Sequence, residues 1–278
     1  MRPAQELELA IAQAESFGWE PVVGKSVLEG RGYLAGHDAQ RLFDVNAALR
    51  DDTIDGIWCV RGGYGAMRLL TGLDVDAMRR HPKALIGYSD ITALHAAFVD
   101  TANVVCFHGP TARAPLTGFS RASLDRAVIE HRDSCGVATG ARTLRAGRAE
   151  GRLVGGNLAL LASLAGTPFA PDYTGAILVL EDIGEQTYRI DRMLHQLALS
   201  GALSRLSGLV FGHFTDGTPP GDITSRDLDD VLIEAADVAG VPAVAGVPVG
   251  HIEDQWTVPL GAMAELDADA HTLHVALA

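Results

Sequence analysis

Three side chains that together could perform acyl transfer occur in the order serine, glutamate, histidine along the chain. Ser89 follows the apolar run 84–88, Glu181 follows the apolar run 176–180, and His251 lies in a polar segment. A serine hydroxyl becomes a nucleophile when an imidazole takes its proton and a carboxylate holds that imidazole in one tautomer. The sequence therefore contains the minimum set for a covalent hydrolytic mechanism.

Each of these side chains also has a purely structural interpretation. The serine begins the segment Ser-Asp-Ile-Thr, which would start a helix well with the serine as its N-cap. Glu181 could belong to a loop whose acids, Asp182 or Glu185, merely cap the following helix, and a lone loop histidine such as His251 is usually solvated. Two further histidines compete for the role of base: His195 in a leucine-rich helical pattern and His213 at the end of a strand-like run.

A glycine-rich loop, Arg61-Gly62-Gly63-Tyr64-Gly65, follows the strand-like run 54–60. Glycines in such a loop let the backbone approach a ligand with its N–H groups turned inward. The loop is not a GxGxxG fingerprint and lacks the lysine and hydroxyl residue of a phosphate loop, so nucleotide binding is not favoured. The structural alternative is a tight turn that needs positive φ angles.

Two stretches of regular patterning surround these residues. In the first half, strand-like runs alternate with helical patterns, which predicts a parallel sheet with helical crossovers. The second half restarts at Gly151 and ends in a β-rich segment whose runs 262–266 and 272–277 are typical of a hairpin. The pattern is irregular between them, apart from one helix over 124–131. We therefore predict an α/β domain over 1–115, an interdomain connection over 116–150 and a second domain over 151–278.

Composition narrows the functional classes. The formal net charge of -13 argues against sequence-independent binding to nucleic acid or to an anionic membrane surface. No apolar run reaches the length of a bilayer span, and the first residues lack the pattern of a secretory signal. The cysteines Cys59, Cys106 and Cys135 are odd in number and widely spaced, which favours free thiols in a reducing cytoplasm. No metal-ligand cluster is evident, so we expect a cytoplasmic protein without metal or cofactor.

The order Ser…Glu…His is that of the α/β-hydrolases, but Ile91 stands where their G-x-S-x-G elbow has its last glycine. The chain instead resembles, along most of its length, the L,D-carboxypeptidase family of serine peptidases. That family includes muramoyltetrapeptide carboxypeptidases and microcin-immunity peptidases. The matching blocks are 32–49, 59–70, 85–98, 107–110, 151–168, 180–197, 208–214 and 248–268.

This resemblance implies a role for each candidate residue. Ser89 would be the nucleophile, His251 the general base and Glu181 its orienting carboxylate. The backbone N–H groups of Asp90 and Gly63 would form the oxyanion hole. The implied fold is an N-terminal α/β domain and a smaller C-terminal domain with β-structure, with the active site between them.

The resemblance also implies a substrate, a small muropeptide from which a terminal D-amino acid is removed by amide hydrolysis. Arg61 is the candidate cation for the terminal carboxylate, and Gly62 and Tyr64 are further substrate-binding candidates. Two alternatives remain: an immunity-type peptidase acting on a toxic aminoacyl-nucleotide analogue, and a catalytically impaired relative acting as a binding protein. A homodimer is an open alternative to a monomer.

One feature departs from the family pattern. The family opens with a strand before its first helix, whereas here a helical pattern begins almost at once. We therefore expect the first strand of the N-terminal sheet to be missing, with unpaired backbone at the place it would occupy.

Overall fold

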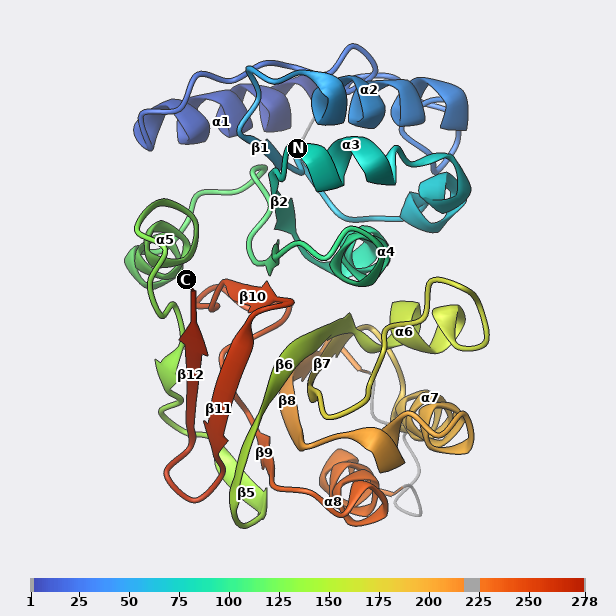
Figure 1. Ribbon diagram of the computed structural model, residues 1–278, viewed down its shortest axis with the longest axis vertical. Coiled ribbons are helices and arrows are strands. Elements are labelled where there is room, and N and C mark those ends of the chain that lie inside the picture. Colours follow the sequence, from blue (N-terminus) through green and yellow to red (C-terminus); the bar gives the residue numbers. More distant parts are fainter. Residues whose placement is uncertain (1–2, 218–225, 278) are drawn as a thin grey trace.

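The computed structural model describes residues 3–217 and 226–277, which form two sheets that share a core. Figure 1 shows the N-terminal sheet with its helices at one end of the molecule and the larger C-terminal sheet at the other. The predicted α/β fold with a parallel N-terminal sheet is confirmed, because β1, β2 and β3 pair in parallel.

The N-terminal sheet has the strand order β1-β2-β3-β10. Its fourth strand, β10, comes from far along the chain and pairs antiparallel with β3. The C-terminal half is therefore tied to the N-terminal sheet by main-chain hydrogen bonds. The elements of this part are α1 (Pro3–Ser16), α2 (Asp38–Arg50), β1 (Gly56–Trp58), η1 (Ala66–Gly72), α3 (Val75–Arg80), β2 (Ala84–Gly87), η2 (Ser89–Ile91), α4 (Thr92–Thr101), β3 (Cys106–His108) and β10 (Val258–Leu260).

The C-terminal sheet has the order β4-β12-β11-β6-β7-β8-β9-β5. Strands β6 to β9 are parallel, whereas β11 and β12 form the predicted antiparallel hairpin. The elements are α5 (Gly118–Leu124), the π-helical turn η3 (Asp125–Ile129), β4 (Gly136–Val137), β5 (Arg142–Arg145), β6 (Arg148–Asn157), α6 (Leu158–Leu164), β7 (Ile177–Ile183), α7 (Thr187–Leu199), η4 (Leu203–Arg205), β8 (Gly208–Thr215), α8 (Leu228–Ala239), β9 (Ala243–Ala245), β11 (Met263–Asp267) and β12 (Thr272–Ala276).

Strand β7 is buried on both faces, which explains its continuous apolar sequence. Ile177 and Val179 belong to the core shared with the N-terminal half. Leu178 and Leu180 belong to a second core formed with α6, α7 and α8. Because side chains alternate between faces along a strand, residue 181 continues the face directed towards the N-terminal half.

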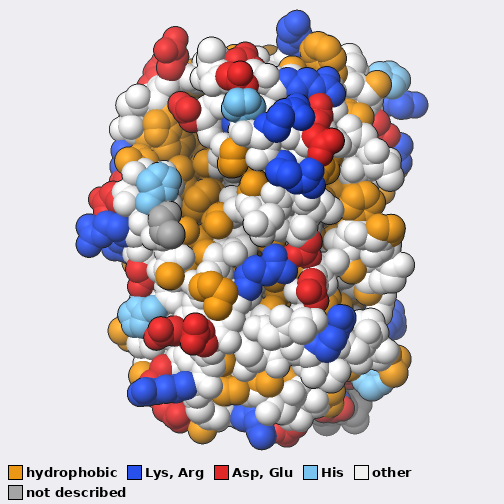
Figure 2. All heavy atoms as spheres, viewed as in Figure 1, with side chains coloured by type: hydrophobic (Ala, Val, Ile, Leu, Met, Phe, Trp, Pro, Cys, Tyr) orange, Lys and Arg blue, Asp and Glu red, His pale blue; other side chains and the backbone are white. Residues whose placement is uncertain are grey.

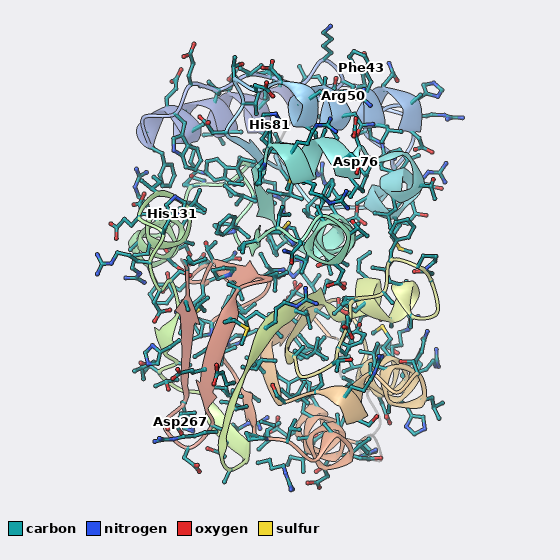
Figure 3. The ribbon with its side chains drawn as sticks, in the orientation of Figure 1. Phe43, Arg50, Asp76, His81, His131 and Asp267 are labelled. Atoms are coloured by element: carbon teal, nitrogen blue, oxygen red, sulfur yellow. The ribbon has the colours of Figure 1, made fainter. Side chains whose placement is uncertain are left out.

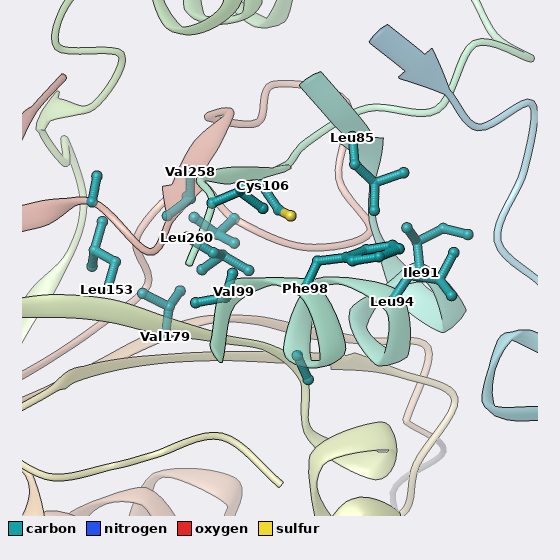
Figure 4. Close-up of a cluster of buried hydrophobic side chains, with 14 of the residues drawn as sticks. Leu85, Ile91, Leu94, Phe98, Val99, Cys106, Leu153, Val179, Val258 and Leu260 are labelled. Carbon is teal, nitrogen blue, oxygen red and sulfur yellow. The ribbon is translucent and has the colours of Figure 1, made fainter. Parts of the chain in front are cut away.

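Helix α4 fills the space between the two sheets. Figure 4 shows Leu94, Phe98 and Val99 of this helix between Leu85 of β2 on one side and Val179 of β7 on the other. All of these side chains are buried, and the hydrophobic effect of such burial is about 25 cal/mol per Å² of apolar surface. This continuous core fixes the end of β2, and with it the turn to α4, against the second sheet.

The segment 116–150 is more regular than its sequence pattern predicted. It contains α5 and the π-helical turn η3, which together form one helical stretch that covers most of the predicted helix over 124–131 but begins earlier, at Gly118; β4, β5 and the first residues of β6 follow. β5 is an edge strand whose partner among the described strands is β9; Thr143 and Arg145 are exposed, whereas Arg142 and Leu144 are half-buried. With these additions the second sheet has eight strands and the N-terminal sheet four. The domain division at residues 115 and 150 stays a prediction.

The first element among the described residues is a helix. α1 begins at Pro3, and the residues between α1 and α2 contribute no strand to a sheet, apart from one isolated bridge between Arg31 and Leu34. The extended run 21–23 is unpaired and Val22 is 74% exposed. β1 consequently has β2 as its one partner among the described strands.

The surface carries charges of both signs. Figure 2 shows acidic and basic side chains intermixed over one face of the molecule. In Figure 3, Phe43 and Arg50 of α2 lie at one end of the molecule, and Asp267 of β11 lies towards the other. Within the described residues, no helix is long and apolar enough to cross a bilayer.

Candidate active site

Ser89 occupies the sharp turn between β2 and α4. Its φ is +63°, a left-handed conformation that is uncommon outside glycine and often occurs where a functional side chain is held under strain. The N-cap positions of η2 and α4 are Tyr88 and Ile91, and neither makes a side-chain cap hydrogen bond. The capping interpretation of Ser89 is therefore wrong, and its hydroxyl is free for another role.

His251 and Glu181 form a hydrogen-bonded pair. Nδ1 of His251 lies 2.8 Å from Oε2 of Glu181, whose side chain is fully buried. Since a carboxylate can only accept, Nδ1 carries the proton and Nε2 of the neutral ring is left as an acceptor. Gly250 makes this approach feasible: a Cβ there would lie 3.2 Å from Oε2 and 3.0 Å from the carbonyl oxygen of His213.

The turn that carries Ser89 adjoins this pair. The ring of Tyr88 lies 4.7 Å from the ring of His251, centroid to centroid. On the glycine-loop side, a Cβ at Gly62 would lie 3.2 Å from Oγ of Ser89. The structure thus brings the serine turn, the histidine, the glutamate and the glycine loop together, although they come from four separate parts of the sequence.

Two hydrogen-bonded steps connect the helix after Ser89 to the strand of Glu181. The hydroxyl of Thr92, at the start of α4, accepts a hydrogen bond from the backbone N–H of Asn157 at 2.9 Å. Asn157 in turn is the register partner of Glu181 between the parallel strands β6 and β7. All three residues are buried, so the spacing between the nucleophile's helix and the carboxylate is rigidly determined.

Asp182 has a different role from its neighbour. Its carboxylate accepts hydrogen bonds from the side chain of Asn157 and from the backbone N–H groups of Ala159 and Ile183, so it supports the start of α6. Burial is the main cause that raises the pKa of Asp182 to about 6. The capping alternative is therefore right for Asp182, although the helix it caps is α6 and not the following helix α7. Glu181 remains available to bond His251.

The side chain of Asp90 fastens the glycine loop to the serine turn. Its Oδ2 accepts a hydrogen bond of 2.8 Å from the backbone N–H of Ala66, which directly follows the loop. Burial raises the pKa of this carboxyl, against the lowering effect of the backbone bonds from Ala66 and Gly65. Sequence reasoning assigned Asp90 only a backbone donor. The sequence did contain a signal for this side-chain role: an acidic residue directly follows the candidate nucleophile at an otherwise apolar helix start.

The candidate substrate-binding residues surround the same loop. Arg61 is 55% exposed and lies 3.9 Å from a carboxylate oxygen of Glu6, which is a loose ion pair. Tyr64 is exposed and meets Tyr33 edge to face at 5.5 Å. Tyr33 is a further aromatic side chain that sequence reasoning missed, because it is 31 positions from its partner in a segment without regular patterning.

The competing histidines do not join the pair. His195 lies exposed on α7. His213 is half-buried on β8, and its backbone N–H donates to the carbonyl oxygen of Val249, which anchors the segment leading to His251. Within the described residues, no three His, Cys, Asp or Glu side chains are grouped as a metal site would require.

Comparison with known proteins agrees with this arrangement. Residues 1–109 match the LD-carboxypeptidase N-terminal domain and residues 150–266 the LD-carboxypeptidase C-terminal domain. A probable murein peptide carboxypeptidase of Bacillus subtilis is 38% identical over 96% of this chain and 86% of its own.

Solved structures show the same fold. The muramoyltetrapeptide carboxypeptidase of Oxalobacter formigenes superposes with a TM-score of 0.88 at 31% identity, covering 98% of this chain and 94% of its own. The microcin C7 self-immunity protein MccF in complex with aspartyl sulfamoyl adenosine has a TM-score of 0.88 at 23% identity, covering 99% and 91%, which is a likeness of fold. The chain therefore belongs to the LD-carboxypeptidase family and is a peptidase of the carboxypeptidase type.

Proposed function

We propose that this carboxypeptidase is a serine peptidase that releases the terminal D-amino acid from murein-derived tetrapeptides. The observation that carries the proposal is the hydrogen bond between Nδ1 of His251 and Oε2 of Glu181, beside the turn of Ser89. The names of the Bacillus and Oxalobacter relatives supply the substrate class.

In the proposed acylation step, Oγ of Ser89 attacks the carbonyl carbon of the bond to the terminal residue. Nε2 of His251 takes the hydroxyl proton, and the carboxylate of Glu181 stabilises the resulting imidazolium without becoming protonated itself. The negative charge on the substrate oxygen is stabilised by the backbone N–H groups of Asp90 and Gly63. Gly63 has a φ of +93°, and a Cβ there would meet Nε of Arg61 at 4.0 Å, so little packs against this face of the loop, which suits a donor that must face a ligand.

Collapse of this tetrahedral intermediate breaks the amide bond. The imidazolium returns its proton to the leaving nitrogen, and the D-amino acid departs with a neutral amine. Water then attacks the acyl-enzyme ester, with His251 again taking a proton, and the shortened peptide leaves as Ser89 regains its hydroxyl hydrogen. In each step His251 accepts or returns one proton while the carboxylate of Glu181 orients it, and these two groups are held at 2.8 Å.

The decisive experiment measures release of D-alanine from a muropeptide tetrapeptide by the wild type and by Ser89→Ala. Removing the nucleophile should lower kcat by about 10⁴-fold or more. Ser163→Ala is the matched control, because that hydroxyl is exposed on α6 and bonds only to the carbonyl oxygen of Ala159. Equal turnover by the wild type and Ser89→Ala would refute the mechanism.

Two further measurements separate the other functions. A fluorophosphonate probe should label the wild type at Ser89, whereas a catalytically impaired binding protein would stay unlabelled. Aspartyl sulfamoyl adenosine, added as a competing substrate, should be cleaved more slowly than the tetrapeptide; the reverse order would favour an immunity-type peptidase.

A reducing compartment is part of the proposal. Cys59, Cys106 and Cys135 are all free thiols in the structure. Burial raises the pKa of Cys59 to about 12, which keeps this thiol protonated and unreactive although it lies close to the serine turn. We infer that the protein works in the cytoplasm, on peptides recovered from the wall.

A further inference from the structure

The segment 109–113 runs beside both the strand of Ser89 and the glycine loop. The backbone N–H of Gly109 donates to the carbonyl oxygen of Gly87 at 3.0 Å, two residues before the serine. The N–H of Arg113 donates to the carbonyl oxygen of Val60 at 3.1 Å, next to the loop residue Arg61. The backbone of Arg113 is thus fixed at the rim of the candidate active site.

The guanidinium of Arg113 has no hydrogen-bond or ion-pair partner within the described part of the chain, although its side chain is half-buried. Other arginines around the loop are engaged: Arg41 bonds to Asp38 and to the carbonyl oxygen of Gly65, and Arg61 approaches Glu6. A partly desolvated guanidinium offers five donors in a fixed fork, and an anion is the partner that satisfies them best.

The charge of Arg113 acts on Tyr88, the residue that precedes the nucleophile. It acts on the phenol of Tyr88, where it lowers the pKa against the raising effects of burial and of Glu181. Tyr88 directly precedes Ser89, and its ring contacts the ring of His251. Arg113 and Glu181 therefore act on Tyr88 with opposite charges, and together with the backbone bonds of the segment that carries Arg113 this places the positive charge in the neighbourhood of the serine turn.

We propose that Arg113 binds the free terminal carboxylate of the peptide substrate, an inference that rests on the proposed function. In a carboxypeptidase that carboxylate is one residue beyond the scissile carbonyl, about 3.8 Å along the chain. A cation is therefore needed close to the nucleophile, and a guanidinium fits a carboxylate with two parallel hydrogen bonds. Arg61, the cation that the sequence pointed to, is more exposed and already has Glu6 nearby.

The test compares a tetrapeptide that ends in a free carboxylate with the same peptide ending in a C-terminal amide. The wild type should prefer the acid in kcat/KM, and Arg113→Gln should reduce this preference by about 10- to 100-fold, the range of a charge-assisted hydrogen bond. Arg113→Lys should restore part of the preference, because a single charge remains without the fork. Arg132→Gln, at an exposed arginine that pairs with Glu130 away from the site, is the matched control and should keep the wild-type preference, whereas Arg61→Gln tests the competing candidate.

A binding measurement makes the result independent of turnover. In a Ser89→Ala background, calorimetry should show tighter binding of the acid than of the amide, and the added Arg113→Gln change should remove the difference. An unchanged acid-to-amide ratio in Arg113→Gln, with wild-type probe labelling at Ser89 to show that the site is intact, would overturn the inference. If Arg61→Gln, and not Arg113→Gln, abolishes the preference for the acid, then Arg61 binds the terminal carboxylate.

Failure of the proposed function has a different signature. In that case the wild type would release no D-alanine and bind no probe, whereas the acid-to-amide difference in binding would still report on Arg113. If the wild type releases D-alanine and Arg113→Gln keeps the same acid-to-amide preference, the inference about Arg113 is rejected and the proposed serine peptidase mechanism is unaffected.

Discussion

Nδ1 of His251 and Oε2 of Glu181 lie 2.8 Å apart, although 70 residues separate them in the sequence. The other carboxylate oxygen, Oε1, is buried and has no hydrogen-bond partner among the described residues. The single bond to the imidazole is therefore the contact that fixes this side chain, and the two residues depend on each other for their orientation.

Replacing Glu181 with glutamine should lower kcat by about 10²- to 10⁴-fold with little change in folding. The amide has nearly the same shape, but it has no charge to stabilise the imidazolium and no longer requires the proton to be on Nδ1. Kinetics of D-alanine release would measure the effect. Glu185→Gln, a change at a carboxylate that pairs with Arg189 outside the site, serves as the control. A loss below about threefold would contradict the role.

Gly62→Ala should impair catalysis by pressing on the nucleophile. The added Cβ would lie 2.9 Å from Cβ of Ser89 and 3.2 Å from its Oγ, while the backbone of Gly62 does not need a positive φ. A displacement of this kind should reduce kcat by about 10²-fold. Gly30→Ala, where nothing lies within 4 Å of the added atom, should leave kcat unchanged. Normal labelling of Gly62→Ala by the probe would contradict this contact.

Asp90→Ala should loosen the glycine loop and destabilise the fold. The N–H of Ala66 would lose its buried acceptor, which costs about 1–3 kcal/mol in the free energy of unfolding. Asp90→Asn retains an acceptor oxygen and should recover most of the loss. Urea unfolding of both variants measures the difference. Equal stability of the alanine and asparagine variants would show that this hydrogen bond does not support the loop.

His95→Phe should change the pH dependence of stability. His95 is fully buried, and burial lowers its pKa from 6.5 to about 3 against the raising effect of the backbone of Leu85. The unfolded chain therefore takes up a proton below pH 6.5 that the native state refuses. Stability is lost as the pH falls from 6.5 towards 3, at about 1.4 kcal/mol per pH unit for this one group.

Asp90 and Asp182 titrate in both His95→Phe and the wild type, so their contributions cancel in the comparison, which then reports on His95 together with its effect on the pKa of the neighbouring His108. Between pH 6.5 and 4, the free energy of unfolding of the variant should increase relative to that of the wild type as the pH falls. A difference that stays constant over this range would mean that His95 is protonated in the native protein.

Local patterning predicted much of the fold. The alternation of strands and helices identified the parallel N-terminal sheet, and the runs after residue 260 identified the hairpin of β11 and β12. These elements are recognisable because strand and helix periods act over a few residues. The pairing of β10 with β3 was not predicted, since its residues are about 150 positions apart and three-residue strands have no clear period.

The residues of the candidate site also separate into those that the sequence predicted and those that only the structure revealed. Sequence identified Ser89, Glu181, His251 and the glycine loop, because each stands at the end of a recognisable element and the family resemblance connects them. It did not identify the side chain of Asp90 or the half-buried Arg113. Those depend on which backbone groups approach them across the fold, as Ala66 approaches Asp90.

The sequence by itself determined which chemistry the chain can offer: a hydroxyl, an imidazole, a carboxylate and a flexible glycine backbone. Only the tertiary structure decided that the imidazole belongs to Glu181 and that Asp182 supports α6 instead. The physical reason is the alternation of faces on β7. One face of the strand meets the N-terminal half and the other meets α6, so two adjacent acids are directed to opposite sides of the sheet.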